Sequence, residues 1–282
     1  MSPMLMADSI YIPSPARVAA IKTLTARDKL LTLELSGGQS LDYQPGQFVE
    51  VSVLGIGEAP FTISSSPGHG TRTARKFELC IRKVGDVAVA LHNLSEGATV
   101  GVRGPFGKGF PLEKMHGKDI LFAPQGPGLA CARSLINRVL AERSLFGRVI
   151  ILYDAEKPSE LLFQDELDAW HKCNEVELLV TVNRHYESWT GYVGAITTLF
   201  HCVTMNPRNT VAITIGRPMT YRLVLIELLG KGIPEGQIWL SLEWRIRCGV
   251  GKCGHCRIDH LYCCLQGPCF SYAQIKNLED AI

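Results

Sequence analysis

The chain has 282 residues, of which 46% are hydrophobic and 20% are charged, and its formal net charge is +2 at pH 7. No apolar run approaches the ~18 residues that a membrane-spanning helix needs, so we expect no membrane span. Lys and Arg form no clustered run, which argues against nucleic acid as a partner.

The N-terminal segment MSPMLMADSIYIPSPARV has neither the basic region nor the apolar region of a secretion signal, which favours the cytoplasm. A chain of this length can form at least two packed domains and a smaller appendage.

Residues 17–103 contain short apolar or alternating runs separated by clusters of Gly, Pro, Asp and Ser, a pattern typical of β-strands. The runs predict an antiparallel six-stranded barrel and read RVAAIKTL, LLTLEL, FVEVSV, FTISSS, KFELCIRK and TVGVR.

From Gly117 onward, apolar runs alternate with helical patterns, which predicts a parallel sheet with crossover helices. Its five expected strands are DILFAP, RVIILY, VELLVTV, TVAITI and QIWLSL, with a helix after each of the first four. The helix after Gly128 has a buried stripe of Ala132, Leu135, Ile136, Val139 and Leu140. The next helix is expected to begin at Ser159 as N-cap and to run through Phe163, Leu167 and Trp170.

The change of period near residues 113–118 places the first domain boundary. We expect a β-barrel domain at 1–115, an α/β domain at 116–236 and a small cysteine-rich domain at 237–282.

Six of the ten cysteines crowd between positions 248 and 269, and in a reducing compartment such crowding points to metal rather than to disulfides. For the scattered cysteines we expect core packing, because a free Cys in an apolar segment behaves as a small hydrophobe; they are Cys80, Cys131, Cys173 and Cys202.

Cys248, Cys253 and Cys256 have the C-x4-C-x2-C spacing of plant-type ferredoxins, which predicts a 2Fe–2S cluster. Gly249, Gly251 and Gly254 would let the loop backbone pass close to the sulfides and point N–H groups at them. The alternative is a four-cysteine zinc site, although such sites prefer two C-x2-C pairs.

The fourth cluster ligand stays open on spacing alone, because Cys263, Cys264 and Cys269 all lie within reach. His255 could ligate as in a Rieske centre, but a lone His between glycines is more often exposed and without such a role.

From about residue 15 to its end, the chain resembles the ferredoxin–NADP reductase superfamily. The narrower resemblance is to the branch with a C-terminal 2Fe–2S domain: the gamma subunits of cytoplasmic nickel–iron hydrogenases, the corresponding subunit of anaerobic sulfite reductase and the electron-transfer subunit of dihydroorotate dehydrogenase. The matching strings are PGQFVEVSV, EAPFTISSSP, LHNLSEGATVGVRGPFGKGFPLEKM, LLFQDEL, WTGYVGAITTLF and SLEWRIRCGVGKCGHC.

The resemblance assigns a cofactor to each of the three domains. It implies an FAD-binding β-barrel domain at 1–115, an NAD(P)-binding α/β domain at 116–236 and a 2Fe–2S cluster domain at 237–282.

In such a protein, FAD binds at the segment that matches the EAPFTISSSP string. Phe61 would pack on the flavin next to Pro60, and Thr62 would reach the hydride-accepting N5 atom as the catalytic residue. The string would continue along the flavin through Ile63, Ser64 and Ser65. From composition alone, FTISSS is no more than an edge strand that ends in a polar turn.

By the same resemblance, Arg82 and Gly85 would approach the FAD pyrophosphate, an Arg offering a fork of donors and a Gly allowing backbone contact. The motif usually carries Thr or Ser where this chain has Ala88, so one phosphate hydrogen bond is in doubt.

The NAD(P) segments depart further from the family. The turn Gln125–Cys131 stands where relatives read close to GGIGLAP, and it keeps Gly126 and Gly128 but has Pro127, which removes a donor. Where relatives resemble CGPP, the chain reads Ile215, Gly216, Arg217 and Pro218, and Arg217 can either hold a phosphate or fill the pocket.

For the fourth cluster ligand, the resemblance implies Cys264, because the family's aromatic–Val–Cys string aligns with Tyr262, Cys263 and Cys264.

Two functions are compatible with the resemblance. In the first, the chain is an NAD(P)H-dependent flavin oxidoreductase subunit that exchanges electrons between NAD(P)(H), FAD and the 2Fe–2S cluster, with the catalytic subunits of a nickel–iron hydrogenase as the expected partner. In the second, it is an electron relay or structural subunit with a degenerate nucleotide pocket. The partner can also be a sulfite reductase or a dihydroorotate dehydrogenase, and the sequence does not choose NADH over NADPH.

Overall fold

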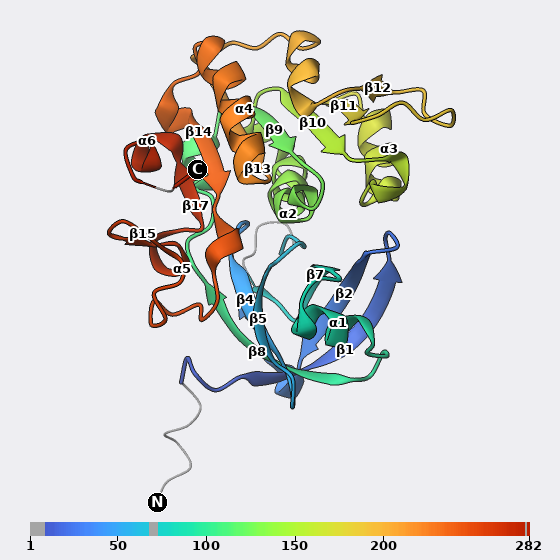
Figure 1. Ribbon diagram of the computed structural model, residues 1–282, viewed down its shortest axis with the longest axis vertical. Coiled ribbons are helices and arrows are strands. Elements are labelled where there is room, and N and C mark those ends of the chain that lie inside the picture. Colours follow the sequence, from blue (N-terminus) through green and yellow to red (C-terminus); the bar gives the residue numbers. More distant parts are fainter. Residues whose placement is uncertain (1–8, 68–72, 280) are drawn as a thin grey trace, which may run out of the picture.

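The computed structural model describes residues 9–67, 73–279 and 281–282. An antiparallel barrel, an α/β sheet and a cysteine-rich C-terminal segment pack against one another, with the sheet above the barrel and the C-terminal segment beside both (Figure 1). Within the described ranges, no helix has the length and apolar character needed to cross a membrane.

The barrel has six antiparallel strands in the order β5-β4-β8-β1-β2-β7, as the sequence predicts. A bridge between Ile63 and Leu79 joins its two edges and closes it. The strands are β1 Ser14–Thr23, β2 Asp28–Leu35, β4 Phe48–Val53, β5 Gly57–Thr62, β7 Lys76–Arg82 and β8 Thr99–Phe106. A separate pair, β3 (Leu41–Asp42) and β6 (Thr73–Ala74), lies outside this sheet, and α1 (Asp86–His92) packs on the barrel.

The fourth barrel strand begins earlier than the run FTISSS at 61–66 predicts, because β5 spans Gly57–Thr62 and includes Pro60. A proline lacks the N–H of a sheet ladder, but an edge strand such as β5 tolerates it. The chain therefore leaves the ladder just after Thr62, and that strand end faces the α/β domain.

The second sheet has the order β12-β11-β10-β9-β13-β14-β17 and contains all five predicted parallel strands. These are β9 Asp119–Pro124, β10 Val149–Ala155, β11 Val176–Val182, β13 Thr210–Ile215 and β14 Ile238–Ser241. Two short edge strands add to them: β12 (Tyr192–Val193), which is parallel, and β17 (Cys269–Ser271), which is antiparallel. Because β14 and β17 come from either side of the cysteine loop, the C-terminal segment is built into this sheet.

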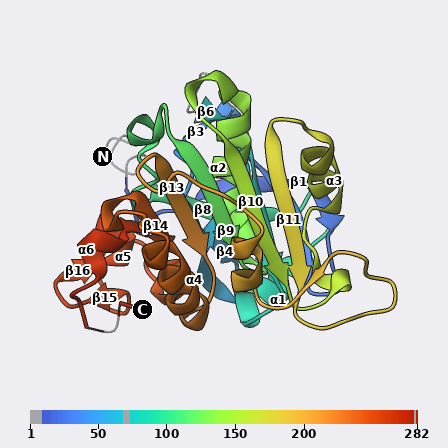
Figure 2. The same ribbon diagram turned by 90° about the horizontal axis from the view of Figure 1, so that it is seen from above.

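Helices cover both faces of the sheet (Figure 2). One face packs against α2 (Gly128–Ala141) and α3 (Gln164–Lys172), and the other against α4 (Pro218–Gly230) and the 3-10 helix Ile196–His201. The predicted stripe of α2 is buried, except that Leu140 is only partly buried.

Two helix predictions in this domain are wrong. Ser159 is not an N-cap, because it lies in a 3-10 turn at Pro158–Glu160 and α3 begins only after Phe163, whose backbone is left-handed. The segment after β11 forms β12 and a 3-10 helix instead of an α-helix crossover.

The C-terminal segment consists of short elements around the cysteine loop: the 3-10 turn Glu243–Arg245, β15 (Arg257–Ile258), β16 (Leu261–Tyr262), α5 (Cys263–Gln266) and α6 (Tyr272–Ile275). It touches the barrel where Arg103 on β8 donates to the carbonyl oxygen of Cys248, at 3.3 Å. The predicted domain boundaries at 115 and 236 stay predictions.

Candidate functional site

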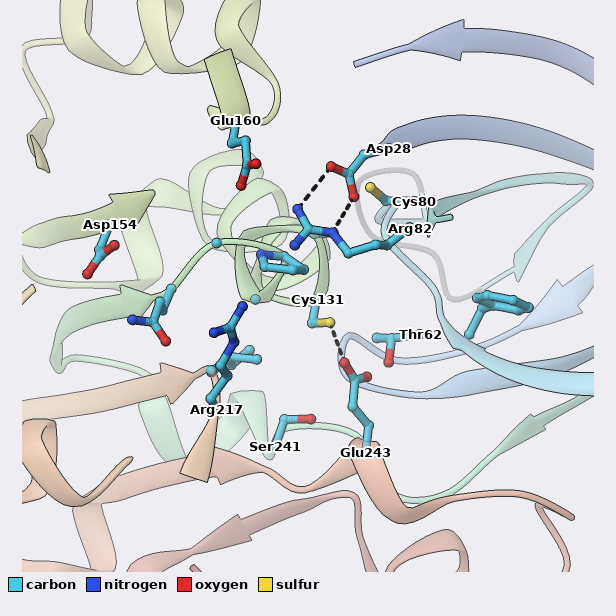
Figure 3. A pocket seen from close by; sticks show the side chains of 18 of the residues that line it. Asp28, Thr62, Cys80, Arg82, Cys131, Asp154, Glu160, Arg217, Ser241 and Glu243 are labelled. Atoms are coloured by element: carbon cyan, nitrogen blue, oxygen red, sulfur yellow. Dashed lines mark hydrogen bonds and ion pairs between the residues drawn. The ribbon is translucent and has the colours of Figure 1, made fainter. Parts of the chain in front are cut away.

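A cavity of about 430 Å³ opens between the barrel and the α/β domain (Figure 3). Its walls are the ends of β5 and β7 from the barrel and the chain just after β9, β10 and β13. In the α/β sheet, β9 lies between β10 and β13, so the strand order reverses there and leaves a crevice at the carboxyl ends of the strands. Such a switch point is where open α/β sheets bind their ligands.

The cavity brings together most of the residues expected to bind FAD and NAD(P). Its lining includes Pro60, Phe61, Thr62, Arg82, Gly126, Gly128, Gly216 and Arg217. The remaining members of the set lie elsewhere: Ile63 is in the barrel core, Ser64 is fully buried, Ser65 bonds to Tyr43, and Gly85 is exposed before α1. Ala88 is buried in the barrel core and is not among the residues that line the cavity.

Thr62 is the last residue of β5, and its hydroxyl oxygen is buried without a hydrogen-bond partner among the described residues. A buried hydroxyl of this kind costs free energy unless something bonds it. Since Thr62 lines the cavity, a polar atom of a bound ligand can supply the missing bond. Together with the adjacent Phe61 ring, this wall fits the polar edge and flat face of a flavin.

Arg82 is already held by a carboxylate. Its Nε and Nη2 donate to the two oxygens of Asp28 at 2.9 and 3.0 Å, and Asp28 is almost fully buried. This hydrogen-bonded partner is the main reason that the pKa of Arg82 lies above its usual value. The remaining face of the guanidinium is what Arg82 can offer to a phosphate.

The turn after β9 leads directly into α2. Gly126 has a φ of 49°, in the left-handed region that favours glycine, and a Cβ at Gly128 would lie 2.2 Å from the carbonyl oxygen of Ile215 on β13. Both glycines therefore serve the packing of strand, turn and helix. The N–H groups of Gly128, Leu129 and Ala130 already donate within the turn, to Gln125, Gly126 and Pro127.

Acidic groups face the two turns expected to bind NAD(P), residues 125–131 and 215–218, which we call the nucleotide turns. Asp154 at the end of β10 accepts from the Ile196 N–H at 3.1 Å, and burial raises its pKa to about 6, against lowering effects of Ile196, Gln125 and Arg217. Glu156 and Glu160 also line the cavity. Arg217 is the cation that faces Asp154, whereas Glu160 faces Arg82 and pairs with Lys157 at 3.8 Å.

Sequence reasoning missed a buried pair at the inner end of the cavity. Cys131 on α2 donates its thiol hydrogen to Glu243 Oε1 over 2.7 Å, and the Thr62 side chain faces the same thiol (Figure 3). Cys131 belongs to the buried core, as expected, and also lines the cavity. Cys80 and Cys173 pack against the same core, and Cys80 lines the cavity too, whereas the prediction is wrong for Cys202, which is exposed. The one available signal was Glu243, a lone carboxylate in the apolar run before the cysteine loop.

The cysteine loop has the backbone that its glycines predict. Gly249, Gly251 and Gly254 have φ values of 72°, 70° and 74°, which side chains with a Cβ rarely adopt. Backbone N–H groups point at sulfur: Gly251 donates to Cys264 at 3.1 Å and Cys253 to Cys248 at 3.5 Å. Burial opposes ionisation of the Cys248 thiol, but the N–H groups of Cys253, Val250 and Lys252 outweigh it and lower its pKa to about 7. The loop therefore favours a thiolate at Cys248, whereas burial raises the pKa of Cys264 to about 12 against the lowering effect of the Gly251 N–H.

The four predicted cluster ligands form two pairs, Cys248 with Cys253 and Cys256 with Cys264. Cys269 lies apart on β17, where its sulfur is 3.7 Å from the carbonyl oxygen of Gly46. Within residues 9–67, 73–279 and 281–282, no three His, Cys, Asp or Glu side chains gather where a single metal ion could bind. Two pairs fit a cluster with two irons better than one tetrahedral zinc.

Two protein-family models match this chain, one in its N-terminal part and one in its C-terminal part. Residues 15–110 match the oxidoreductase FAD-binding domain, and residues 243–276 match the iron–sulfur cluster binding domain of dihydroorotate dehydrogenase B. The second range contains every cysteine of the loop.

Two relatives are similar to this chain over nearly its whole length. The sulfhydrogenase 2 subunit gamma of Pyrococcus furiosus is 35% identical over 93% of this chain and 96% of its own. A probable dihydroorotate dehydrogenase B (NAD(+)) electron transfer subunit of Methanothermobacter thermautotrophicus is 28% identical over 97% of this chain and 94% of its own.

Among solved structures, the chain has the fold of an NADH-dependent reduced ferredoxin-NADP oxidoreductase, with a TM-score of 0.74 and 20% identity over 92% of this chain and 88% of that one. A ferredoxin NADP+ reductase from Neisseria gonorrhoeae, solved with FAD and NADP, has a TM-score of 0.68 and 20% identity over 81% of this chain and 97% of that one.

Proposed function

The chain belongs to the family of the sulfhydrogenase gamma subunits, and from that membership we propose that it exchanges electrons between NAD(P)(H), FAD and a 2Fe–2S cluster and passes them to or from a partner in the cytoplasm. The observation that carries the proposal is the cavity itself. Three parts of the fold meet in its walls: the end of β5, both nucleotide turns, and Glu243 in the segment that leads into the cysteine loop.

FAD would supply the step between two-electron and one-electron chemistry. On the barrel side, the Phe61 ring would pack against the flavin and the unpartnered Thr62 hydroxyl would bond its polar edge. Arg82 would turn its free side toward the pyrophosphate while Asp28 holds it in place.

On the other wall, Gly126, Gly128 and Gly216 would let a nicotinamide dinucleotide approach the backbone, and Arg217 would pair with a phosphate. Cys248, Cys253, Cys256 and Cys264 would bind the cluster. A chain with these parts only relays electrons, so the final chemistry belongs to a partner, for which we propose a nickel–iron hydrogenase.

The second candidate function is an electron relay without nucleotide binding. It is favoured by the turn after β9, whose N–H groups at 128–130 already donate within the turn and are not free for a pyrophosphate. The acidic residues Asp154, Glu156 and Glu160 would also repel phosphates.

Anaerobic stopped-flow on the native FAD-loaded complex separates the two candidates. If the first is correct, NADH or NADPH bleaches the flavin absorbance, and Arg217→Met weakens this reduction at least about tenfold through loss of a charge-assisted bond. If neither nucleotide bleaches the flavin, the relay function is correct. A complex that releases no flavin on denaturation contradicts both.

The proteins that elute with the native chain identify the partner. Hydrogenase subunits are the expected result, whereas a dihydroorotate dehydrogenase or sulfite reductase subunit would replace the hydrogenase in this proposal.

A further inference from the structure

Gln125 stands in the crevice at the carboxyl ends of β9, β10 and β13, which we call the nucleotide crevice. It is the first residue after β9, which lies between β10 and β13 where the strand order reverses, and it lines the cavity. The family's turn has glycine at the matching position. The Gln125 side chain therefore occupies room that a glycine would leave open.

The Gln125 side chain reaches to both sides of the nucleotide crevice. Its Oε1 accepts a hydrogen bond from the hydroxyl of Thr220, in the first turn of α4, the helix that follows β13. Toward β10 it faces Asp154, where burial raises the pKa of the carboxyl and Gln125 is among the groups that lower it. The Gln125 N–H also donates to the carbonyl oxygen of Ile215 on β13, at 2.8 Å. Both neighbours of β9 thus hold this residue in place.

Gly216, in the second nucleotide turn, is packed beneath the same side chain. A Cβ built on Gly216 would lie 3.2 Å from the Cβ atoms of both Gln125 and Thr220. These two side chains therefore fill the space over Gly216. A dinucleotide needs that space to come close to the backbone of the turn.

We propose that the Gln125 side chain is a latch across the nucleotide crevice, and that it sets the affinity of this chain for a nicotinamide dinucleotide. The amide must leave Thr220 before the dinucleotide can enter. This inference rests on the proposed function, because it takes NAD(P)(H) as the ligand of the crevice.

The latch acts on affinity through the fraction of molecules in which it is open. A ligand that binds only the open state shows an affinity that is reduced by this fraction. Opening gives up the hydrogen bond from Thr220 and the contact with Asp154. One hydrogen bond shifts such an equilibrium by about two- to tenfold, so loss of the amide should tighten dinucleotide binding about tenfold.

The first test is the dissociation constant of NAD+ and of NADP+, measured by isothermal titration calorimetry on the oxidised native complex as purified. Oxidised nucleotides bring no hydride, so binding is separated from electron transfer. Gln125→Ala keeps the Cβ over Gly216 but removes the amide, and it should bind about tenfold more tightly than the wild type. Gln39→Ala removes an exposed amide on the barrel and should keep the wild-type constants.

The second test releases the other end of the latch. Thr220→Val keeps the shape of the buried side chain but lacks the hydroxyl donor, and it should also tighten binding. Thr220→Ser keeps the donor and should restore constants close to those of the wild type. If the amide only stabilised the fold, Gln125→Ala and Thr220→Val would lower the thermal midpoint without any gain in affinity.

Equal or weaker binding in Gln125→Ala and Thr220→Val overturns the latch, and so does the absence of binding in the wild type and in every variant. If the wild-type flavin is bleached by NADH or NADPH while the variants keep the wild-type constants, the latch alone is wrong and the proposed function stands. Binding by Gln125→Ala but not by the wild type supports the latch and assigns the relay function to the wild-type chain. If Gln125→Ala does not fold, the pair at Thr220 decides.

Discussion

Asp154 sits at the carboxyl end of β10 with 1% of its surface exposed, and burial raises its pKa from 3.8 to about 6. Between pH 3.8 and about pH 6, the folded chain keeps the Asp154 proton whereas the unfolded chain has released it. The free energy of unfolding therefore falls as the pH rises through this range, and it stays lower at higher pH. The full loss of unfolding free energy across this range is on the order of 3 kcal/mol.

Asp154→Asn keeps an acceptor for the Ile196 N–H but cannot ionise. The free energy of unfolding should be measured in urea at pH 5 and at pH 7.5 for both proteins. From pH 5 to pH 7.5 the wild type should lose about 1 kcal/mol or more of this free energy relative to the variant. Parallel pH dependences in the two proteins would show that the carboxyl is already charged at pH 5.

Cys264 and Cys263 are neighbours in α5, and both are buried. Cys264 receives the Gly251 N–H from the cysteine loop, which favours it as the fourth ligand. Cys264→Ser should lose the cluster and Cys263→Ser should keep it. Iron and acid-labile sulfide, each near two per chain in the wild type, provide the measurement, and zinc without sulfide would contradict the cluster itself.

At the scale of elements, the contact between α2 and β13 fixes the nucleotide turn. Because a Cβ at Gly128 would meet the backbone of Ile215 at 2.2 Å, Gly128→Ala must push the helix away from the sheet. We expect a loss of about 1–3 kcal/mol of unfolding free energy, as for other overpacked positions.

Gly230, at the end of α4, is the matched control. A Cβ there meets no atom within 4 Å and the backbone is helical, so Gly230→Ala should be neutral or stabilise by up to about 1 kcal/mol. Thermal unfolding of the two variants side by side makes the comparison. Equal midpoints would mean that α2 shifts without cost.

For the whole molecule, Arg133 on α2 holds the two large units together. It bonds Glu78 on β7 at 2.6 Å and Glu166 on α3 at 2.7–2.9 Å, while its guanidinium stacks 4.7 Å from the Phe163 ring centroid. Arg133 is 9% exposed, so its removal leaves two half-buried carboxylates without their cation.

Arg133→Met should cost about 3–5 kcal/mol, as removal of one partner of a buried ion pair does, and should loosen the cavity that the two units share. Lys22→Met tests the alternative that any link between the barrel and α3 matters, since Lys22 bonds Asp165 at 2.6 Å and both side chains are largely exposed to solvent. That variant should keep the wild-type midpoint in urea. Similar losses in both would contradict the special role of Arg133.

The sequence by itself determined the elements whose signal is local. Alternating apolar runs predicted the barrel strands, and five apolar runs with helical patterns between them predicted the parallel strands, because side-chain periodicity follows directly from backbone geometry. The cysteine loop was equally readable, since its spacing and its positive-φ glycines lie within a few residues of one another.

Only the tertiary structure decided what depends on residues far apart in the chain. Pro60 in β5 is tolerated because that strand is an edge, and Arg82 is neutralised by Asp28 on a neighbouring strand. Cys131 faces Glu243 across more than a hundred residues of chain. Periodicity and spacing contain no information on such pairs, because burial, a missing hydrogen-bond partner and a shifted pKa all arise only when the barrel, the sheet and the cysteine loop close on one cavity.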